Sequence, residues 1–184
     1  MRTKLGILFA ALALASCSTA KDVPELAADG DAEEAAYRLP SIPAGVKADR
    51  ILVDKSDRLL VLFNDGEEIA RYSKIRFGEV PDGHKRFEGD ERTPEGVYTI
   101  DGRNPGSRYH LSLRVSYPNT ADRAYAEARG KSAGGDIFLH GQPNGYDGPP
   151  IDRDWTDGCI ALSNAEIEQI WDVVPDGATI EIRP

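Results

Sequence analysis

Residues 137–160, with the sequence IFLHGQPNGYDGPPIDRDWTDGCI, decide how this 184-residue chain folds and where its chemistry lies. The apolar run before His140 predicts a short buried strand that ends at this histidine. The next residues are rich in Gly and Pro, which is typical of a loop. The loop leads to a Gly158-Cys159 pair, where the glycine permits a tight bend. The sequence therefore places a histidine and a cysteine at the two ends of one loop.

The sequence upstream and downstream of this stretch is mostly β in character. Short apolar or alternating runs predict strands, and turn residues such as Asn64-Asp65-Gly66 separate them. The expected strands cover residues 51–53, 59–63, 67–72, 97–100, 110–117, 137–139 and 179–183. This pattern predicts a mainly β domain.

Two segments predict helices. Residues 122–129 are rich in alanine and predict a short helix. Ser163 and Glu166 have the spacing of a capping box, which marks a second helix start. The apolar residues after this start form one helical stripe, namely Ile167, Ile170, Trp171 and Val174. Pro175 is expected to end this helix.

The composition narrows the possible partners and cofactors. Charged residues make up 29% of the chain and the formal net charge is -9, which argues against nucleic acid as a partner. The chain has only two cysteines and three histidines, which argues against a disulfide framework and against a zinc site. We therefore expect neither a metal nor another cofactor.

The N-terminal residues 1–16 resemble a secretory signal peptide. Arg2 and Lys4 precede an apolar run that is too short to span a bilayer comfortably. The small residues before Cys17 resemble the lipobox of bacterial lipoproteins, in which the cysteine is lipidated. The alternative is an ordinary signal peptide with a chance cysteine. Ser18 stands where an Asp would resemble an inner-membrane retention signal. We therefore expect a periplasm-facing protein anchored to the outer membrane of a Gram-negative cell.

Residues 17–46 predict a lipidated flexible tether. This segment is acidic and is interrupted by Pro and Gly, so it offers little apolar surface to bury. The expected organisation is a signal peptide over residues 1–16, the tether over residues 17–46, and one catalytic domain over residues 47–184.

Cys159 and His140 are the candidates for a nucleophile and its base. If Cys17 carries lipid, Cys159 has no partner for a disulfide in an exported protein. A cysteine attacks as its thiolate, so it needs a base, and a histidine at a strand end can turn its ring toward a cleft. The residues alone leave two alternatives open. Cys159 could be a small buried hydrophobe, and His140 could be a hydrogen-bonded core histidine.

Several ordered motifs resemble the YkuD-type L,D-transpeptidase catalytic domain. That family has a His, a spacer of comparable length, and then Ser/Thr-His-Gly-Cys, which His140 and the stretch Thr156-Asp157-Gly158-Cys159 match. Residues 89–98, GDERTPEGVY, resemble its Asp-x-x-Thr-Pro-x-Gly-x-Tyr stretch. Tyr117-Pro118-Asn119 and Asn164 fit the YafK-like murein subgroup. The resemblance covers residues 48–184 and implies the β-sandwich or barrel of that family, with two short helices.

The resemblance also implies a reaction on the stem tetrapeptide of peptidoglycan. Cys159 would attack the carbonyl of the third residue and form a thioester, and His140 would pass the thiol proton to the leaving D-Ala. The Gly141 carbonyl would orient the imidazole, and the amides of Asp157 and Gly158 would form the oxyanion hole. An amine of another stem peptide, or of a wall-linked lipoprotein, would resolve the thioester. The implied role is in cell wall biogenesis and cell shape.

Two residues depart from the family pattern. Asp157 stands where the family often has His, and Ala161 where it often has Arg. A charged Asp157 would raise the pKa of the neighbouring thiol unless it points away or pairs with Arg153. The missing Arg removes an expected carboxylate anchor, for which Arg92 and Arg114 are candidate replacements.

The remaining expectations concern substrate contacts and the outcome of the reaction. Residues 142–155 could form a lid, with Tyr146 and Trp155 lining the cleft, or an ordinary surface loop. Asn164 is a further candidate for substrate binding. One alternative function is hydrolytic, as an L,D-carboxypeptidase or an amidase that releases lipoprotein from peptidoglycan. Another is an inert peptidoglycan-binding lipoprotein, against which the intact His140–Cys159 pair argues.

Overall fold

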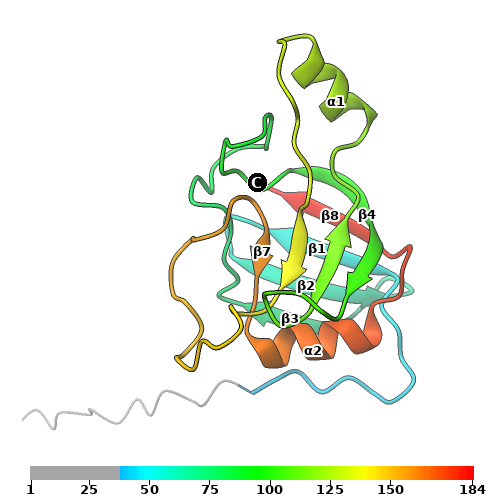
Figure 1. Cartoon of the computed structure of the whole chain (residues 1–184). Coiled ribbons are helices and arrows are strands. Elements are labelled where there is room, and N and C mark those ends of the chain that lie inside the picture. The colour runs from blue at the N-terminus through cyan, green and yellow to red at the C-terminus, as the bar shows by residue number, and fades with distance from the viewer. Residues whose placement is uncertain (1–37) are drawn as a thin grey trace, which may run out of the picture. The chain divides into compact units, whose positions relative to one another are not determined.

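Eight strands pair into one curled sheet in the computed structural model, which describes residues 38–184 (Figure 1). The strands are β1 (Arg50–Asp54), β2 (Leu59–Asn64), β3 (Glu67–Ser73), β4 (Gly96–Asn104), β5 (Ser112–Val115), β6 (Phe138–His140), β7 (Ile160–Ala161) and β8 (Thr179–Arg183). Their order across the sheet is β3-β2-β1-β8-β4-β5-β6-β7. The helices are α1 (Thr120–Glu127) and α2 (Asn164–Val173). The prediction of a mainly β fold with two short helices is confirmed.

The first half of the sheet is an antiparallel meander that also pairs with the last strand. β1 pairs with β2, and β2 pairs with β3 across the predicted turn, where Asp65 and Gly66 both have positive φ. β1 also runs parallel to β8. Alternate residues of β1, such as Ile51 and Val53, are fully buried. This alternation is the period-two pattern from which the strands were predicted.

β4 joins the two halves of the sheet. Residues 96–99 of β4 pair with β8, whereas residues 100–104 pair with β5. The register shifts between Ile100 and Gly102, and such a bulge bends a strand. The sheet can therefore curl, and its second half carries β5, β6 and β7. In that half, Ser112 of β5 lies opposite His140 of β6.

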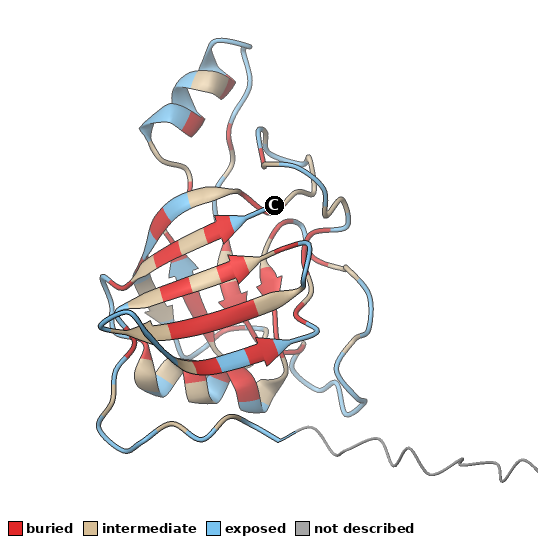
Figure 2. Ribbon diagram, turned by 180° about the vertical axis from the view of Figure 1, so that it is seen from behind, coloured by how far each residue is buried: buried red, intermediate tan, exposed pale blue. Residues whose placement is uncertain are grey.

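The two helices lie in different environments. The capping box of α2 is present, with Ser163 as N-cap and Glu166 closing it, and Ile167 and Ile170 are fully buried. Figure 2 shows α2 against the buried side of the sheet, whereas α1 projects from the opposite end and is largely exposed. The Asn119 side chain caps α1. The amphipathic stripe that predicted α2 is therefore the surface that packs on the sheet.

The segment that precedes β1 contacts α2. The Gln169 side chain donates to the Pro40 carbonyl at 2.8 Å, and Ile42 packs against the hydrophobic core. The Ala48 amide donates to the Val173 carbonyl at 2.9 Å. Residues 40–46, which we expected to belong to the tether, thus lie along this helix. The expected signal peptide, Cys17 and residues 18–37 of the tether fall outside the described residues.

Candidate active site

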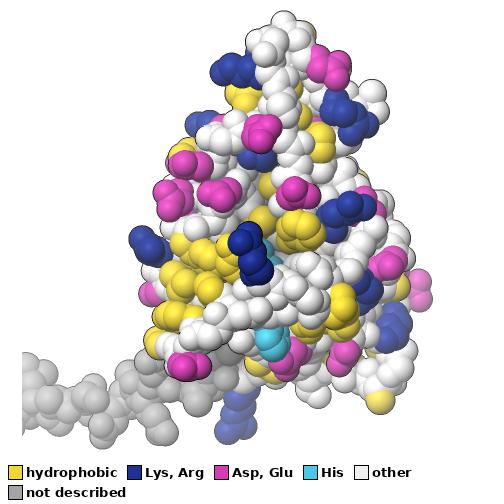
Figure 3. All heavy atoms as spheres, in the orientation of Figure 1, with side chains coloured by type: hydrophobic (Ala, Val, Ile, Leu, Met, Phe, Trp, Pro, Cys, Tyr) yellow, Lys and Arg dark blue, Asp and Glu magenta, His cyan; other side chains and the backbone are white. Residues whose placement is uncertain are grey.

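A cavity of about 590 Å³ brings His140 and Cys159 together. It lies between the β4–β5 connection, β6 and the segment that leads into β7. The other residues that line it are Asn104, Gly106, Ser107, Arg108, Tyr109, Ser112, Gly135, Asp136, Phe138, Trp155, Thr156 and Asp157. On the face drawn in Figure 3, hydrophobic side chains gather in the middle and acidic ones lie above them. The loop between the two predicted residues therefore folds back and returns the cysteine to the histidine.

The position of His140 leaves one ring nitrogen free to act as a base. His140 ends β6 and is 3% exposed. Its Nδ1 lies 2.7 Å from the Gly141 carbonyl oxygen. Because a carbonyl only accepts, this contact assigns the proton of the neutral ring to Nδ1 and leaves a lone pair on Nε2. Within residues 38–184, no side chain or backbone group is hydrogen-bonded to Nε2.

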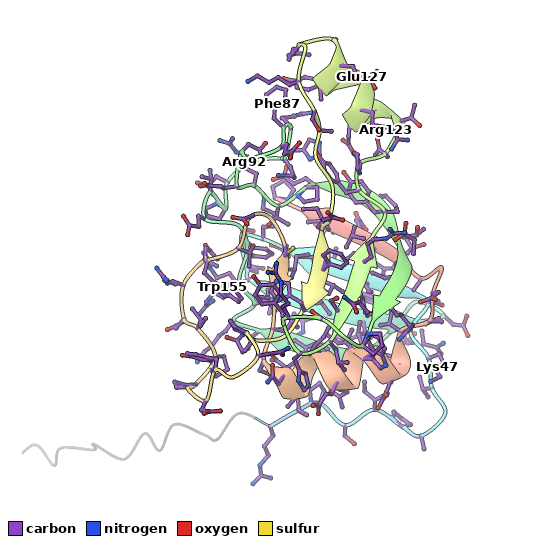
Figure 4. The ribbon with its side chains drawn as sticks, in the orientation of Figure 1. Lys47, Phe87, Arg92, Arg123, Glu127 and Trp155 are labelled. Carbon is purple, nitrogen blue, oxygen red and sulfur yellow. The ribbon has the colours of Figure 1, made fainter. Side chains whose placement is uncertain are left out.

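Two aromatic rings enclose the imidazole of His140. The Tyr109 ring lies 4.7 Å away between centroids, and the Trp155 ring meets it edge-on at 5.5 Å. Trp155 reaches inward from the segment before β7 (Figure 4). This burial lowers the pKa of His140, although the hydrogen bond to Gly141 opposes the shift. The ring is therefore neutral at neutral pH. The sequence predicted Trp155 as a lining residue, but nothing in the local pattern marked Tyr109.

Cys159 is presented by a turn that only glycine can form. Gly158 has a φ of +126°, and a Cβ there would lie 2.5 Å from the Arg92 carbonyl oxygen. The Thr156 hydroxyl donates to the Cys159 carbonyl at 2.8 Å and closes the turn. The Cys159 thiol lies 3.4 Å from the Asp136 carbonyl oxygen, to which it donates. The turn therefore fixes the thiol at the cavity wall.

The electrostatics of the site favour a neutral thiol in the resting state. Cys159 is half-buried. This burial raises the pKa of the thiol to about 11, and a hydrogen bond from the Phe138 amide opposes the shift. The negative charge of Asp157 raises it further. Since the pKa of His140 is lowered, the pair rests as thiol and imidazole rather than as an ion pair.

The two predicted oxyanion donors lie in the turn beside the thiol. Gly158 donates its amide to the Thr156 hydroxyl at 3.2 Å, so a substrate oxygen would have to replace that contact. Asp157 lines the cavity, and the structure shows no ion pair between it and Arg153 within residues 38–184. The role of both amides stays a prediction.

The model of one family, the YkuD L,D-transpeptidase catalytic domain, matches residues 48–182. The chain belongs to this family.

Relatives of known structure share the YkuD fold. Pgp2 of Campylobacter jejuni, described as a helical cell shape determining protein, is 30% identical with a TM-score of 0.60, over 79% of this chain and 50% of Pgp2. Bd1075 of Bdellovibrio bacteriovorus is 27% identical with a TM-score of 0.52, over 79% of this chain and 51% of Bd1075. The present chain thus spans about half the length of each.

A curated relative is similar over a shorter stretch. YafK of Escherichia coli (strain K12), named as a proposed L,D-transpeptidase, is 31% identical over 104 residues. These residues are 55% of this chain and 35% of YafK. The similarity agrees with the subgroup that the sequence motifs indicated.

The two arginines expected to replace the family's Arg have partners outside the cavity. The Arg92 Nε donates to the Asp82 carbonyl at 2.9 Å, and the Arg114 Nε donates to the Asp101 carboxylate at 2.8 Å. Neither side chain lines the cavity of this YkuD domain. Arg92 lies well above Trp155 in Figure 4. Their role in binding substrate stays a prediction, which the described contacts do not favour.

Asn164 and Tyr146 also lie outside the cavity lining. The Asn164 Oδ1 accepts from the Gln142 amide at 2.8 Å, and a Cβ at Gly141 would lie 2.6 Å from that oxygen. Asn164 therefore supports the backbone turn that follows His140. Tyr146 is 40% exposed, and its hydroxyl lies against Gly148 within the same loop.

Within residues 38–184, no three His, Cys, Asp or Glu side chains cluster as metal ligands would. In the same residues, no helix combines the length and the apolar character needed to cross a bilayer.

Proposed function

We propose that this YkuD-family domain is a cysteine-dependent L,D-transpeptidase that acts on peptidoglycan stem tetrapeptides. The observation that carries the proposal is the placement of Cys159 and His140 in one cavity, where Nε2 of the histidine has no partner among residues 38–184. Family membership supplies the substrate class, because the family acts on peptidoglycan. The product would contribute to cell wall biogenesis.

The proposed first half-reaction forms a thioester. The Cys159 sulfur attacks the carbonyl carbon of the third stem residue while its proton passes to Nε2 of His140. The imidazolium that results keeps its Nδ1–H bond to the Gly141 carbonyl, which stabilises the charged ring. The tetrahedral intermediate then collapses, the bond to D-Ala breaks, and the D-Ala nitrogen takes the proton from Nε2. Terminal D-Ala leaves as a free amine.

The second half-reaction resolves the thioester. An amine from another stem peptide, or from a wall-linked lipoprotein, loses its proton to His140 and attacks the carbonyl. The carbon–sulfur bond breaks, an amide forms, and the thiol is restored. Water could attack in place of the amine, which would make the domain an L,D-carboxypeptidase. An amidase would instead act on a stem peptide that already carries lipoprotein.

Product masses distinguish these outcomes. The chain is incubated with disaccharide-tetrapeptide, alone and with an amine acceptor, and the products are weighed beside those of Cys159→Ala. Loss of D-Ala with a new cross-link or an exchanged amine supports the transpeptidase. Loss of D-Ala with tripeptide as the only product indicates the carboxypeptidase. Equal turnover by Cys159→Ala would exclude the mechanism, and silence on all substrates, lipoprotein-linked peptidoglycan included, would favour an inert wall-binding protein.

We further propose that Cys17 carries the lipid that anchors the domain on the periplasmic side of the outer membrane. The support is the signal-like sequence of residues 1–16, which ends in small residues before Cys17. Cys17→Ala should abolish incorporation of radiolabelled fatty acid and release the protein from membranes. Normal labelling of that variant would refute the anchor. Cys159→Ala serves as the matched cysteine control and should be labelled normally.

A further inference from the structure

A second cavity, of about 560 Å³, lies next to the segment that precedes Trp155. Four basic side chains line it, namely Arg58, Lys74, Arg76 and Arg153, and we call it the arginine pocket. It shares no lining residue with the cavity of His140 and Cys159. The chain as a whole carries a formal charge of -9, so a local cluster of four cations is a departure from its general character.

Three acidic residues also line the arginine pocket, namely Asp57, Asp152 and Asp154, so four cations meet three anions and the lining keeps a formal charge of +1. The Asp154 carboxylate is fully engaged, because both its oxygens accept from Arg58, at 2.7 and 2.8 Å, and one also accepts from the Phe77 amide at 2.9 Å. Asp152 contacts Arg76, but the Asp152 side chain is 84% exposed. An exposed ion pair of this kind is weak and exchangeable. Of the two arginines that have an ion-pair partner in the pocket, Arg58 and Arg76, Arg76 therefore has the less secure one.

Arg76 has unused capacity for an oxyanion. Its side chain is 13% exposed, and its buried Nε has no hydrogen-bond partner in the described part of the chain, residues 38–184. Buried donors without partners are uncommon, because each costs free energy. Burial and the nearby positive charge of Arg58 both act on Arg76, and they lower its pKa. Arg76 Nη1 donates to the Ile75 carbonyl at 3.3 Å and Nη2 contacts Asp152. Nε and Nη2 share one edge of the guanidinium, so a carboxylate that replaced Asp152 would accept from both atoms.

The arginine pocket is joined to the nucleophile turn through the backbone. The Arg76 amide donates to the Ala161 carbonyl at 3.0 Å, and the Ala161 amide donates back at 2.8 Å. The Phe77 carbonyl accepts from the amides of Trp155 and Thr156, each at 3.2 Å. Paired backbones lie about 5 Å apart. The residue that carries the proposed anion ligand is thus paired through its backbone with Ala161, two residues after Cys159.

We propose that the arginine pocket binds a carboxylate of an acidic peptide, with Arg76 as its main ligand and Asp152 displaced on binding. Lys74 and Arg153 are both exposed and add positive charge at the rim. The identity of the peptide rests on the proposed function, since peptidoglycan stem peptides are acidic. The pocket would then hold a part of the peptide that is remote from the bond being broken.

The test observes Arg76 directly. The full chain with Cys159→Ala is titrated with disaccharide-tetrapeptide, with the same compound amidated at its carboxyl groups, and with inorganic phosphate. The Nε–Hε resonance of each arginine is followed by NMR. The acidic peptide should shift the Arg76 resonance and the amidated one should not. No shift with the acidic peptide, or an equal shift with the amidated one, would overturn the proposal. A response to phosphate as strong as that to the peptide would mean a general anion site and would also overturn it.

Two substitutions and a matched control sharpen the titration. Arg76→Gln should weaken binding of the acidic peptide by about tenfold or more, because a charge-assisted bidentate contact is lost. Asp152→Asn should strengthen it, because an internal competitor is removed, and a folding defect cannot mimic such a gain. Arg71→Gln, an exposed arginine of β3 paired with Glu68, should leave affinity unchanged. Equal affinities in all four proteins, or weaker binding by Asp152→Asn, would contradict the proposal.

The outcome is separable from the fate of the proposed function. Release of D-Ala is measured in parallel with Cys159 restored. Turnover without any Arg76-dependent binding would contradict the proposal for the arginine pocket and would still support the proposed transpeptidase. Arg76-dependent binding without turnover supports the pocket and counts against the transpeptidase.

Discussion

His140 and His84 are both enclosed by protein, but they differ in what their ring nitrogens do. His84 uses both, because its Nδ1 accepts from the Glu95 amide at 2.8 Å and its Nε2 lies 3.0 Å from the Asp122 carboxylate. His140 uses only Nδ1, and its Nε2 has no hydrogen-bond partner within residues 38–184, while the ring lines the same cavity as Cys159. A general base needs a free lone pair. The difference identifies His140 as a candidate base and His84 as a structural link.

The contacts of His84 connect the segment between β3 and β4 to the start of α1. Asp122 stands in the first turn of α1, and it also accepts from the Tyr98 hydroxyl at 3.1 Å and from the Asn119 amide at 3.0 Å. His84 belongs to the segment between β3 and β4. The segment therefore meets the start of α1 through a buried polar network, whose members all depend on one carboxylate.

The same substitution, His→Gln, should lower the reaction rate at His140 and the stability of the fold at His84. The larger effect is expected at His140. His140→Gln should lower kcat for D-Ala release by roughly 10²–10⁴, the usual span for loss of a general acid–base group. The unfolding midpoint in urea should change little, because glutamine is similar in volume and polar. An unchanged rate at neutral pH would show that His140 is not the base.

His84→Gln should affect stability instead. Glutamine cannot keep both contacts, so the free energy of unfolding should fall by about 1–3 kcal/mol, as for a buried polar group left unpaired. The rate of D-Ala release by the folded protein should stay close to that of the wild type. Denaturant unfolding and rate assays on the same samples check this. Loss of activity with intact stability would indicate that His84 takes part in the reaction, and the two histidines would then no longer differ in role.

The pH dependence of the wild type should sharpen the comparison further. Burial lowers the pKa of His140, so the neutral form that can accept a proton persists below the ordinary value of 6.5. Below that lowered pKa, kcat/KM should fall about tenfold per pH unit as the base is protonated. The thiol should cause no change between pH 7 and 9, because its pKa is raised to about 11. An acid limb centred above 6.5 would contradict the buried, neutral imidazole.

Asp157→Asn should give the smallest effect, which is a change in the pKa of the Cys159 thiol, the proton donor of the pair. Removing this negative charge should lower the pKa of the Cys159 thiol, because the charge now raises it. The shift should be modest, since Asp157 is exposed and burial is the main cause. The rate of alkylation by iodoacetamide as a function of pH reports the change, with Asp147→Asn, an exposed loop substitution, as control. A higher midpoint in Asp157→Asn would reverse the assigned sign.

The parts of the fold that local signals determine could be predicted from the sequence. The capping box at Ser163 and the proline at 175 bracket α2, and the structure has this helix at Asn164–Val173. The strand over residues 110–117 was predicted too long, because β5 covers only Ser112–Val115. His110 has a φ of +66° and cannot continue a strand.

Features that depend on pairing between distant residues could not be predicted. β4 extends to Asn104, four residues beyond the predicted end, because backbone pairing with β5 holds residues that lack apolar alternation. β7 has only two residues and no pattern of its own. In the candidate site, the sequence motifs identified His140 and Cys159, and the structure places both residues in the lining of one cavity. Ser112 was missed because its position opposite His140 exists only in the strand register.

The central place of β8 bears on the order in which the domain can fold. β8 is the strand through which the meander of β1, β2 and β3 joins the half that bears the cavity. Pairing Arg50 with Thr179 closes a loop that spans most of the described chain, and contacts of such high sequence separation slow folding. We expect the two halves to remain separate until residues 179–183 are available. The sheet that supports the thiol would then be completed only in a late step, after synthesis of nearly the whole domain.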